Sequence, residues 1–211
     1  MNKIIKDACI LFAITLVAGI LLGLVYDVTK TPIANQNEKA KKEAYQAVLA
    51  DADDFVSLSA SSKYAKIETP IAGEGDFSAD EVTEVAVGVD KNKNPIGVVI
   101  TVVAGDGYGG DIKFSVGIST SGEYLGTSIL SISETAGLGM RAKTDPSFLA
   151  QFNNKMVNEF KVVTDGSGSS SDDKVDAIGG STVTSKAITK GINYALTVYQ
   201  DIMSAGGVTI E

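Results

Sequence analysis

The residues whose types could do chemistry stand together in one segment, which reads Asp176-Ala177-Ile178-Gly179-Gly180-Ser181-Thr182-Val183-Thr184-Ser185-Lys186. Unpaired backbone N–H groups and the positive end of a helix dipole favour a phosphate group where such hydroxyl residues open a helix, and Lys186 adds a positive charge. The simpler interpretation is that Ser181, Thr182 or Thr184 caps the helix, which is the usual role of Ser and Thr in this position. Local chemistry alone favours the cap.

The composition narrows the chemistry that remains. The chain of 211 residues has no histidine and no tryptophan, and its one cysteine, Cys9, lies in an apolar run. Zinc sites of Cys and His, thiolate-held iron–sulfur clusters, haem with a histidine ligand and Ser-His-Asp or Cys-His nucleophiles are therefore excluded, as is a disulfide within the chain. We expect no metal site and no catalytic side chain. Redox chemistry would need an organic cofactor.

The net charge argues against nucleic acid as a partner. The whole chain carries −8 at neutral pH, and residues 1–30 carry one net positive charge, so residues 31–211 carry −9. A domain so acidic repels phosphate backbones. We therefore expect no nucleic-acid partner.

The N-terminal segment predicts a membrane anchor. From Ala8 to Tyr26 the chain has 19 residues without a charge. As a helix rising about 1.5 Å per residue, this run nearly spans a hydrocarbon core of roughly 30 Å. A cleaved secretory signal is the alternative, since Lys3 and Lys6 form a positive start, but the run is long for one and no A-x-A site follows it. We predict one retained transmembrane helix within residues 1–30.

The lysines around this helix leave its orientation open. Two of them precede it and four follow it, namely Lys3 and Lys6, then Lys30, Lys39, Lys41 and Lys42. A simple positive-inside count places the following domain in the cytoplasm, but that rule weakens when a large folded domain follows.

Residues 31–80 predict a connecting segment. Thr31 and Pro32 suit the cap and the first position of a helix, and the Ala/Lys/Glu-rich run to Leu49 contains no helix breaker. From residue 51 to 80 the chain is rich in Ser, Ala, Asp and Gly, which predicts irregular structure with one short strand near 64–67.

Residues 81–205 predict a single α+β domain, with a mostly antiparallel sheet flanked by helices. Two strand-forming runs around a polar turn indicate a first hairpin, and alternating apolar residues indicate a second. Apolar spacings of three and four near the end indicate an amphipathic helix. A polar loop is expected at 165–173. The predicted elements are strands at 82–89, 96–103, 112–118 and 124–132, a helix from Pro146 to about 157, a strand at 160–163 and a helix from Thr184 to about Met203.

Residues 176–185 resemble the flavinylation motif D-x-x-S/T-G-A-T-x-T/S of FMN-binding domains. Such domains occur in the G subunit of the Rnf electron-transport complex and in the C subunit of the sodium-pumping NADH:quinone reductase. In that family a flavin transferase links the FMN phosphate to the threonine of the G-A-T step, which implies one covalent FMN on Thr182. The sequence departs from the motif at Gly179, in place of Ser or Thr, and at Ser181, in place of Ala.

Two glycine-containing segments upstream carry the same resemblance independently. Residues 107–112 are similar to the family's G-Y-G-G-x-I, and residues 134–139 resemble its E-T-P-G-L-G turn, with Ala136 in place of proline. Glycines let the backbone approach a flavin ring, Leu138 can pack on its face, and Thr135 and Tyr108 can hydrogen-bond its rim. The flavin pocket so implied comprises Thr182, Ser181, Gly180, Thr184, Lys186, Asp176, Thr135, Gly137, Leu138, Gly139, Glu134, Tyr108, Gly109 and Gly110.

The resemblance also implies a function. The length and the single anchor are more similar to the Rnf G subunit than to the longer quinone-reductase protein. This implies an electron-relay subunit of an ion-translocating ferredoxin:NAD oxidoreductase, a translocase in which the chain is not catalytic alone. Its implied partners are the other membrane, iron–sulfur and flavin subunits, the flavin transferase and the lipid bilayer. Its flavin domain is expected on the extracytoplasmic side of the inner or plasma membrane.

Two alternatives remain open from the sequence. The chain can be a stand-alone, membrane-tethered flavin reductase that acts on an extracellular acceptor. It can also be an anchored assembly or binding subunit without flavin, as the two departures near Thr182 suggest. Activity of the isolated chain would favour the first alternative, and an unmodified Thr182 the second.

Overall fold

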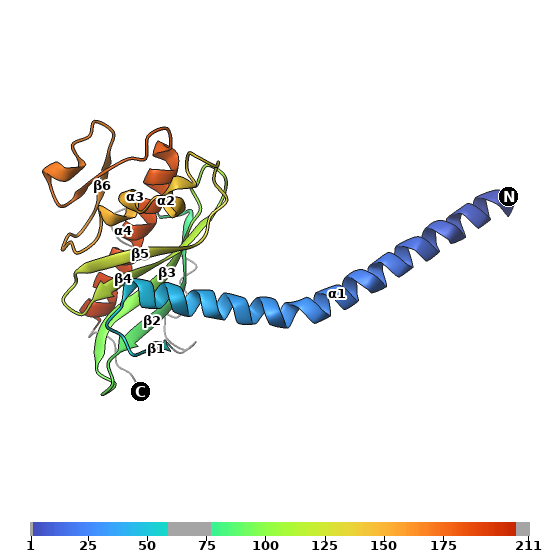
Figure 1. Ribbon diagram of the computed structural model, residues 1–211, viewed down its shortest axis with the longest axis horizontal. Coiled ribbons are helices and arrows are strands. Elements are labelled where there is room, and N and C mark those ends of the chain that lie inside the picture. Colours follow the sequence, from blue (N-terminus) through green and yellow to red (C-terminus); the bar gives the residue numbers. More distant parts are fainter. Residues whose placement is uncertain (1, 59–76, 206–211) are drawn as a thin grey trace. The chain divides into compact units, whose positions relative to one another are not determined.

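The computed structural model describes residues 2–58 and 77–205 (Figure 1). The chain divides into two compact units, Met1–Lys42 and Glu43–Glu211. The short strand expected near residues 64–67 lies outside the described residues. The division into segments 1–30, 31–80 and 81–205 stays a prediction.

One helix, α1 (Asn2–Val48), makes up almost all of the first unit and ends in the second. It is long and apolar enough to cross a membrane, because a stretch of 18 residues reaches a mean hydropathy of 2.8 and none of that stretch is buried. Large apolar side chains from Ile4 to Ile33 are exposed along it. These properties agree with the predicted N-terminal anchor.

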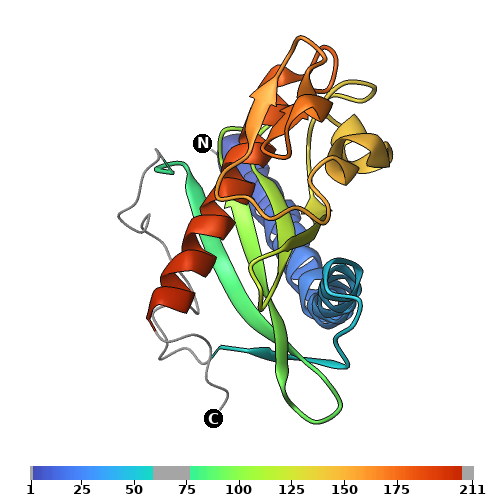
Figure 2. The ribbon, with the colours of Figure 1, turned by 90° about the vertical axis from the view of Figure 1, so that its left-hand side faces the viewer.

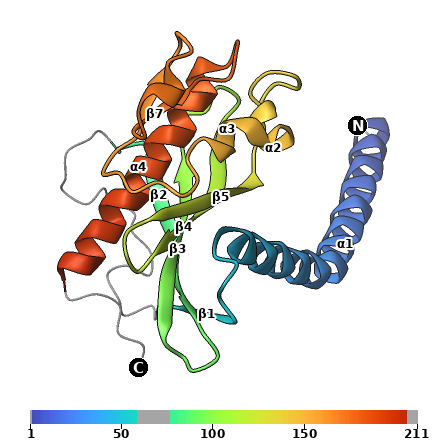
Figure 3. The same ribbon diagram turned by 60° about the vertical axis from the view of Figure 1, so that its left-hand side comes forward.

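The prediction of a separate helix starting at Thr31 and Pro32 was wrong, because α1 continues through both residues. Strong helix formers stand on either side, so the helix extends across the proline rather than ending before it. A proline inside a helix removes one backbone hydrogen bond and bends the axis. Figure 3 shows α1 bent along its length, and Pro32 is the proline within it.

A five-stranded antiparallel sheet forms the centre of the second unit, with its strands in sequence order. The two predicted hairpins are confirmed, whereas the first strand lies in a segment that the sequence indicated to be irregular. The strands are β1 (Asp54–Ser57), β2 (Asp80–Val89), β3 (Pro95–Ala104), β4 (Ile112–Ser119) and β5 (Tyr124–Ser131).

The sheet is covered on both faces, which explains why β2, β3 and β4 are buried almost throughout. Helix α4 (Thr182–Ser204) crosses one face (Figure 2), and its Ile188, Ile192 and Leu196 belong to the main apolar core. The last turn of α1 covers the other face, where Tyr45 and Leu49 join a second apolar cluster. The predicted α+β class is therefore confirmed.

Five short elements connect β5 to α4. They are α2 (Arg141–Thr144), α3 (Pro146–Ala150), β6 (Lys161–Val163), η1 (Gly168–Ser170) and β7 (Lys174–Asp176). Strand β6 was expected, but its parallel partner β7 and the helix α2 were not. The helix from Pro146 is also shorter than predicted and ends at Ala150, followed by turns in which Asn154 has a φ of 56°. An α-helix cannot continue through such a left-handed residue.

A charged cluster fastens α4 to the start of β2. The Nζ of Lys190 lies 2.5 Å from Oδ2 of Asp106 and 3.7 Å from Oδ2 of Asp80. Asp80 is buried, and burial raises the pKa of its carboxyl to about 6, although the charge of Lys190 opposes that rise.

Candidate functional site

A cavity of about 600 Å³ lies where three segments meet, and we name it the Thr182 cavity. The segments are the loop after β3, the loop after β5 and the start of α4. Its wall is made of Tyr108, Glu134, Thr135, Leu138, Gly139, Gly180, Ser181, Thr182, Val183 and Thr184.

The loop after β3 packs directly on the loop after β5. The backbone N–H of Gly109 donates to Oε1 of Glu134 at 3.3 Å, and Glu134 is only 7% exposed. A Cβ on Gly109 would lie 2.2 Å from the carbonyl oxygen of Ser133, so only glycine permits this approach. The glycines therefore bring Tyr108 to the cavity wall.

Gly139 is the point at which the loop after β5 meets α4. A Cβ there would lie 2.6 Å from Oε2 of Glu134 and 2.6 Å from Oγ1 of Thr184. Both of those residues are buried and both border the cavity. Because Gly139 has no side chain, the loop after β5 can pack directly against the first turn of α4.

The third wall begins with a tight turn from Ile178 to Ser181. The N–H of Ser181 donates to the carbonyl oxygen of Ile178 at 2.9 Å, and Gly180 has a φ of 77°. This is the pattern of a type II turn, which favours glycine at its third residue. Gly180 is therefore required by the turn, and it is also the glycine of the family motif.

Ser181 and Thr182 follow this turn and lie at the start of α4. Ser181 occupies the N-cap position, and within the described chain its side chain makes no capping hydrogen bond. Its Oγ is buried, and no partner for it exists among the described residues. The simple capping interpretation is wrong for Ser181, and α4 begins at Thr182 rather than at Thr184.

The first turn of α4 supplies donors to this cavity. The first N–H groups of an α-helix have no acceptor within the helix, and they carry the positive end of its dipole. The first helical bond at this end runs from the N–H of Ser185 to the carbonyl of Ser181, at 3.0 Å. Donor groups of Thr182, Val183 and Thr184 therefore precede the regular bonding, beside a buried hydroxyl that lacks a partner within the described chain.

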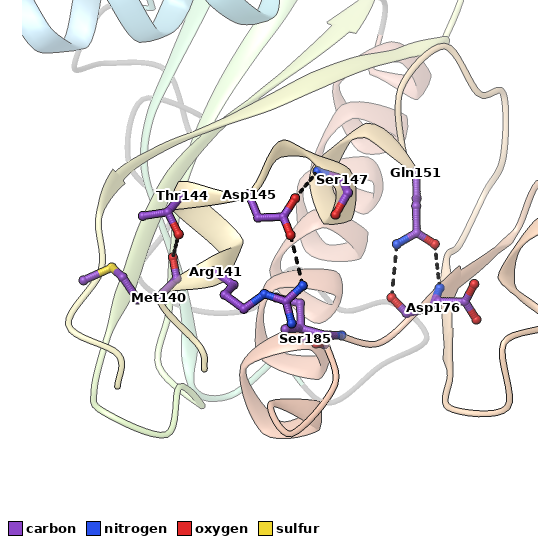
Figure 4. A network of polar contacts seen from close by, with 9 residues as sticks. Met140, Arg141, Thr144, Asp145, Ser147, Gln151, Asp176 and Ser185 are labelled. Carbon is purple, nitrogen blue, oxygen red and sulfur yellow. Dashed lines mark hydrogen bonds and ion pairs between the residues drawn. The ribbon is translucent and has the colours of Figure 1, made fainter. Parts of the chain in front are cut away.

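A second, smaller cavity of about 410 Å³ adjoins the same turn, and we name it the Arg141 cavity. Its polar groups are paired with one another (Figure 4). The side-chain amide of Gln151 donates to the carbonyl of Asp176 at 3.1 Å and accepts from its N–H at 2.7 Å. Hydrogen bonds from Ser147, and then Arg141, lower the pKa of Asp145 to about 2.

The structure brings most of the expected site residues to one wall. Those in the wall of the Thr182 cavity are Tyr108, Glu134, Thr135, Leu138, Gly139, Gly180, Ser181, Thr182 and Thr184. Those outside it are Gly109, Gly110, Gly137, Asp176 and Lys186. Lys186 is exposed, and Asp176 instead accepts a hydrogen bond from the N–H of Gly168 at 3.0 Å.

Sequence reasoning missed three residues that shape the site. Val183 lines the cavity and is 51% exposed, Ser185 is fully buried behind the turn, and Gln151 holds the strand that leads into it. The spacing of Ser181 and Ser185, one helical turn apart, was a visible signal for the second of these.

The arrangement suits a flat, largely apolar ligand with an anionic end. Tyr108, Leu138 and Val183 place apolar side chains at the rim, with exposed fractions of 74%, 43% and 51%. The buried hydroxyl of Ser181, which has no partner among the described residues, and the start of α4 supply donors for an anion. A volume of about 600 Å³ is in the ordinary range for cofactor sites. These residues fit a flavin nucleotide.

Two family models and one solved structure match parts of this chain. The family model for the FMN-binding domain matches residues 107–197, and the model for the RnfG N-terminal region matches residues 1–48. The matched FMN-binding region contains every residue of the cavity wall. A crystal structure of NqrC from Shewanella oneidensis aligns with a TM-score of 0.47 and 19% identity, over 74% of this chain and 71% of that one.

Two relatives match over nearly their whole length. The G subunit of the Na(+)-translocating ferredoxin:NAD(+) oxidoreductase complex of Acetobacterium woodii is 35% identical, over 94% of this chain and 93% of the relative. The G subunit of the proton-translocating complex of Clostridium ljungdahlii is 30% identical, over 90% of this chain and 92% of the relative. Together with the two family models, these matches show that the chain belongs to the family of Rnf complex G subunits and contains the FMN-binding domain of that family.

Proposed function

We propose that this chain carries one FMN, joined through its phosphate to Oγ1 of Thr182, and relays electrons within an ion-translocating ferredoxin:NAD oxidoreductase complex. One observation carries the attachment site. Thr182 opens α4 in the wall of a 600 Å³ cavity, directly after a buried Ser181 hydroxyl that has no partner among the described residues. A phosphate on Thr182 would provide the acceptor that this hydroxyl and the helix N–H groups lack.

The attachment requires an activated donor of FMN. Flavin adenine dinucleotide (FAD) is such a donor, because it joins FMN to AMP through an anhydride. In the proposed step, catalysed by a flavin transferase, Oγ1 of Thr182 attacks the phosphorus on the flavin side. The new P–O bond forms, the anhydride bond breaks, AMP leaves and the hydroxyl proton passes to the transferase or to water. No electron is gained or lost, so the step needs no oxidant.

The chain itself would hold and orient the cofactor, which supplies the electron chemistry. The apolar rim formed by Tyr108, Leu138 and Val183 suits the flavin ring, and the start of α4 suits the phosphate. A covalent tether prevents loss of the cofactor between electron transfers. Because the chain would bind the cofactor and the cofactor would carry the electrons, these features support a relay role in which the chain is not catalytic alone.

The relatives suggest the surroundings of the chain. Their names assign them to complexes that translocate sodium in one organism and protons in another. Since both are G subunits and both align along nearly the whole chain, we assign ion movement to neighbouring subunits. Helix α1 would hold the chain in the bilayer as a single-pass anchor, with the FMN-binding domain on the extracytoplasmic side.

Mass spectrometry tests the attachment directly. The full chain is produced with a flavin transferase, purified in mild detergent and digested, and the peptide that contains Thr182 is weighed. We expect the added mass of FMN less water on the wild type and on Ser181→Ala and Thr184→Val. Thr182→Val should carry none, although the wall keeps its shape. An unmodified wild-type peptide, or a modified Thr182→Val peptide, would overturn the assignment.

A further inference from the structure

Ser185 lies behind the turn that presents Thr182, and its hydroxyl joins the two ends of that turn. Its Oγ accepts a hydrogen bond from the N–H of Ile178 at 2.9 Å and donates one to the carbonyl of Ser181 at 2.9 Å. The side chain is fully buried. Figure 4 shows Ser185 on α4, behind Arg141. One small hydroxyl thus links the first and last residues of the turn from Ile178 to Ser181.

The residues between these ends have little to hold them. Gly179 and Gly180 are both exposed, and the space beside a Cβ on Gly179 is empty to 4 Å. Glycine has the largest conformational freedom of any residue, so a glycine pair does not keep its own shape. The hydrogen bond from Ser181 to Ile178 and the two bonds of Ser185 therefore fix where the turn lies.

The position of this turn decides where the reacting hydroxyl lies. Gly180 and Ser181 are part of the cavity wall, and Thr182 follows without an intervening residue. Phosphoryl-type transfer needs the attacking oxygen in line with the breaking bond, and a displacement of about 1 Å can cost roughly a hundredfold in rate. A shift of the turn moves Oγ1 of Thr182 directly.

We propose that Ser185 is a positioning residue for flavin attachment, an inference that rests on the proposed role of Thr182. Its hydroxyl holds the turn so that Oγ1 of Thr182 faces the flavin donor in the transferase complex. Ser185 is not itself part of the cavity wall, and among the described residues its hydroxyl bonds only to backbone groups of the turn, so it acts through the backbone of Ile178 and Ser181.

The chain offers a matched control one helical turn further along. The hydroxyl of Thr189 donates to the carbonyl of Ser185 at 2.8 Å, and Thr189 is 3% exposed. It therefore repeats the bond of Ser185 to the carbonyl four residues earlier, and no bond from it to the turn is present in the described chain. Removal of the Thr189 hydroxyl therefore measures the effect of losing a buried hydroxyl and its bond within the helix, while the bond of Ser185 to the turn is kept.

The experiment measures the rate of flavin attachment to the full chain in detergent, with a flavin transferase and saturating FAD. The variants are Ser185→Ala, Ser185→Cys and Thr189→Val, and folded protein is quantified by gel filtration and thermal melting. We expect Ser185→Ala to lower the maximal rate roughly tenfold or more, while the KM for FAD changes less than about twofold. Ser185→Cys, whose thiol is a weaker hydrogen-bonding group, should fall between Ala and wild type.

The outcomes separate this inference from the proposed function. If Ser185→Ala loses no more rate than Thr189→Val at equal folded fraction, the positioning role is overturned while attachment at Thr182 stands. A change in KM for FAD with an unchanged maximal rate would also overturn it. If Ser185→Ala does not fold, Ser185→Cys takes its place, and a loss of rate no larger than that of Thr189→Val overturns the positioning role. An unmodified wild-type Thr182 would overturn both proposals.

Discussion

Adjacent residues of one turn border two cavities that differ in how their polar groups are satisfied. Gly180 and Ser181 border the Thr182 cavity, whereas Gly179 borders the Arg141 cavity. On the Arg141 side, Gln151 makes two hydrogen bonds to Asp176, and Arg141 pairs with Asp145 at 3.0 Å. On the Thr182 side, the described chain leaves a buried hydroxyl without a partner.

This difference indicates which of the two cavities is suited to a ligand. Natural proteins pair nearly all of their buried polar groups, so an exception next to a cavity of suitable volume indicates a missing partner. The paired side of the turn stabilises the fold, and under the proposed function the side with the buried Ser181 hydroxyl holds the cofactor. Three changes test this comparison and a fourth, outside both cavities, serves as a reference; they follow in order of decreasing expected effect.

The largest effect is expected from Gly139→Ala, which places a Cβ 2.6 Å from both Glu134 and Thr184. Forcing these walls apart should destabilise the domain by about 1–3 kcal/mol and abolish flavin attachment. Thermal melting and mass spectrometry of the Thr182 peptide measure the two effects. Gly137→Ala is the control, because it shares the loop and has open space around its Cβ, with only its φ of 75° to strain it. Normal attachment in Gly139→Ala would contradict the described wall.

Gln151→Leu tests the paired side. It removes both bonds to the backbone of Asp176 while keeping the size of the side chain. We expect a loss of about 1–3 kcal/mol in unfolding free energy, because an N–H and a carbonyl lose their partners. The fraction of folded protein that carries flavin should stay at the wild-type level. A strong drop in that fraction, with little loss of stability, would show that the Arg141 cavity also serves the cofactor.

Asp80→Asn tests a buried carboxyl group that lies outside both cavities. The pKa of Asp80 is raised from 3.8 to about 6, so its contribution to stability is fully present below pH 3.8 and is lost as the pH rises through about 6. The stability of the wild type relative to Asp80→Asn should therefore fall between about pH 4 and pH 7. Melting temperatures of both proteins across this range give the difference, and a flat difference would refute the assignment. Flavin attachment should be unaffected.

The smallest effect is expected from Gly179→Ser, which restores the residue type that the family motif usually has. A Cβ at this position meets nothing within 4 Å, and the backbone is in an ordinary conformation. We expect stability within about 0.5 kcal/mol of wild type, as for surface substitutions in general. Attachment should proceed at the wild-type rate or faster. A clear loss in the same mass-spectrometric assay would mean that the turn tolerates only glycine there.

Prediction from the sequence succeeded where a pattern is local. The apolar, strand-forming runs of β2 to β5 and the apolar spacing of α4 are properties of the local sequence, so these strands and this helix were correctly expected. Prediction failed where contacts with residues far along the chain determine the local structure. Strand β7 has three residues and exists because it pairs with β6, and the helix from Pro146 ends early where the chain turns back toward β5.

The site shows the same division between local and distant causes. The resemblance identified Glu134 and Gly139, but only the fold reveals that Glu134 accepts from Gly109 and that Gly139 lets it approach Thr184. The bond of Ser185 to Ser181 follows from helical spacing. Its bond to Ile178 depends on a turn whose shape the sequence alone does not define.

The buried hydroxyl of Ser181, for which residues 2–58 and 77–205 offer no partner, links flavin attachment to the maturation of the chain. With a phosphate on Thr182, folding and cofactor loading become thermodynamically linked, because the native state gains hydrogen bonds that the unfolded chain cannot make. The loaded domain should then resist proteases better than the unloaded one. Flavin attachment would thus act as a late folding step, by which a cell distinguishes finished subunits from unfinished ones.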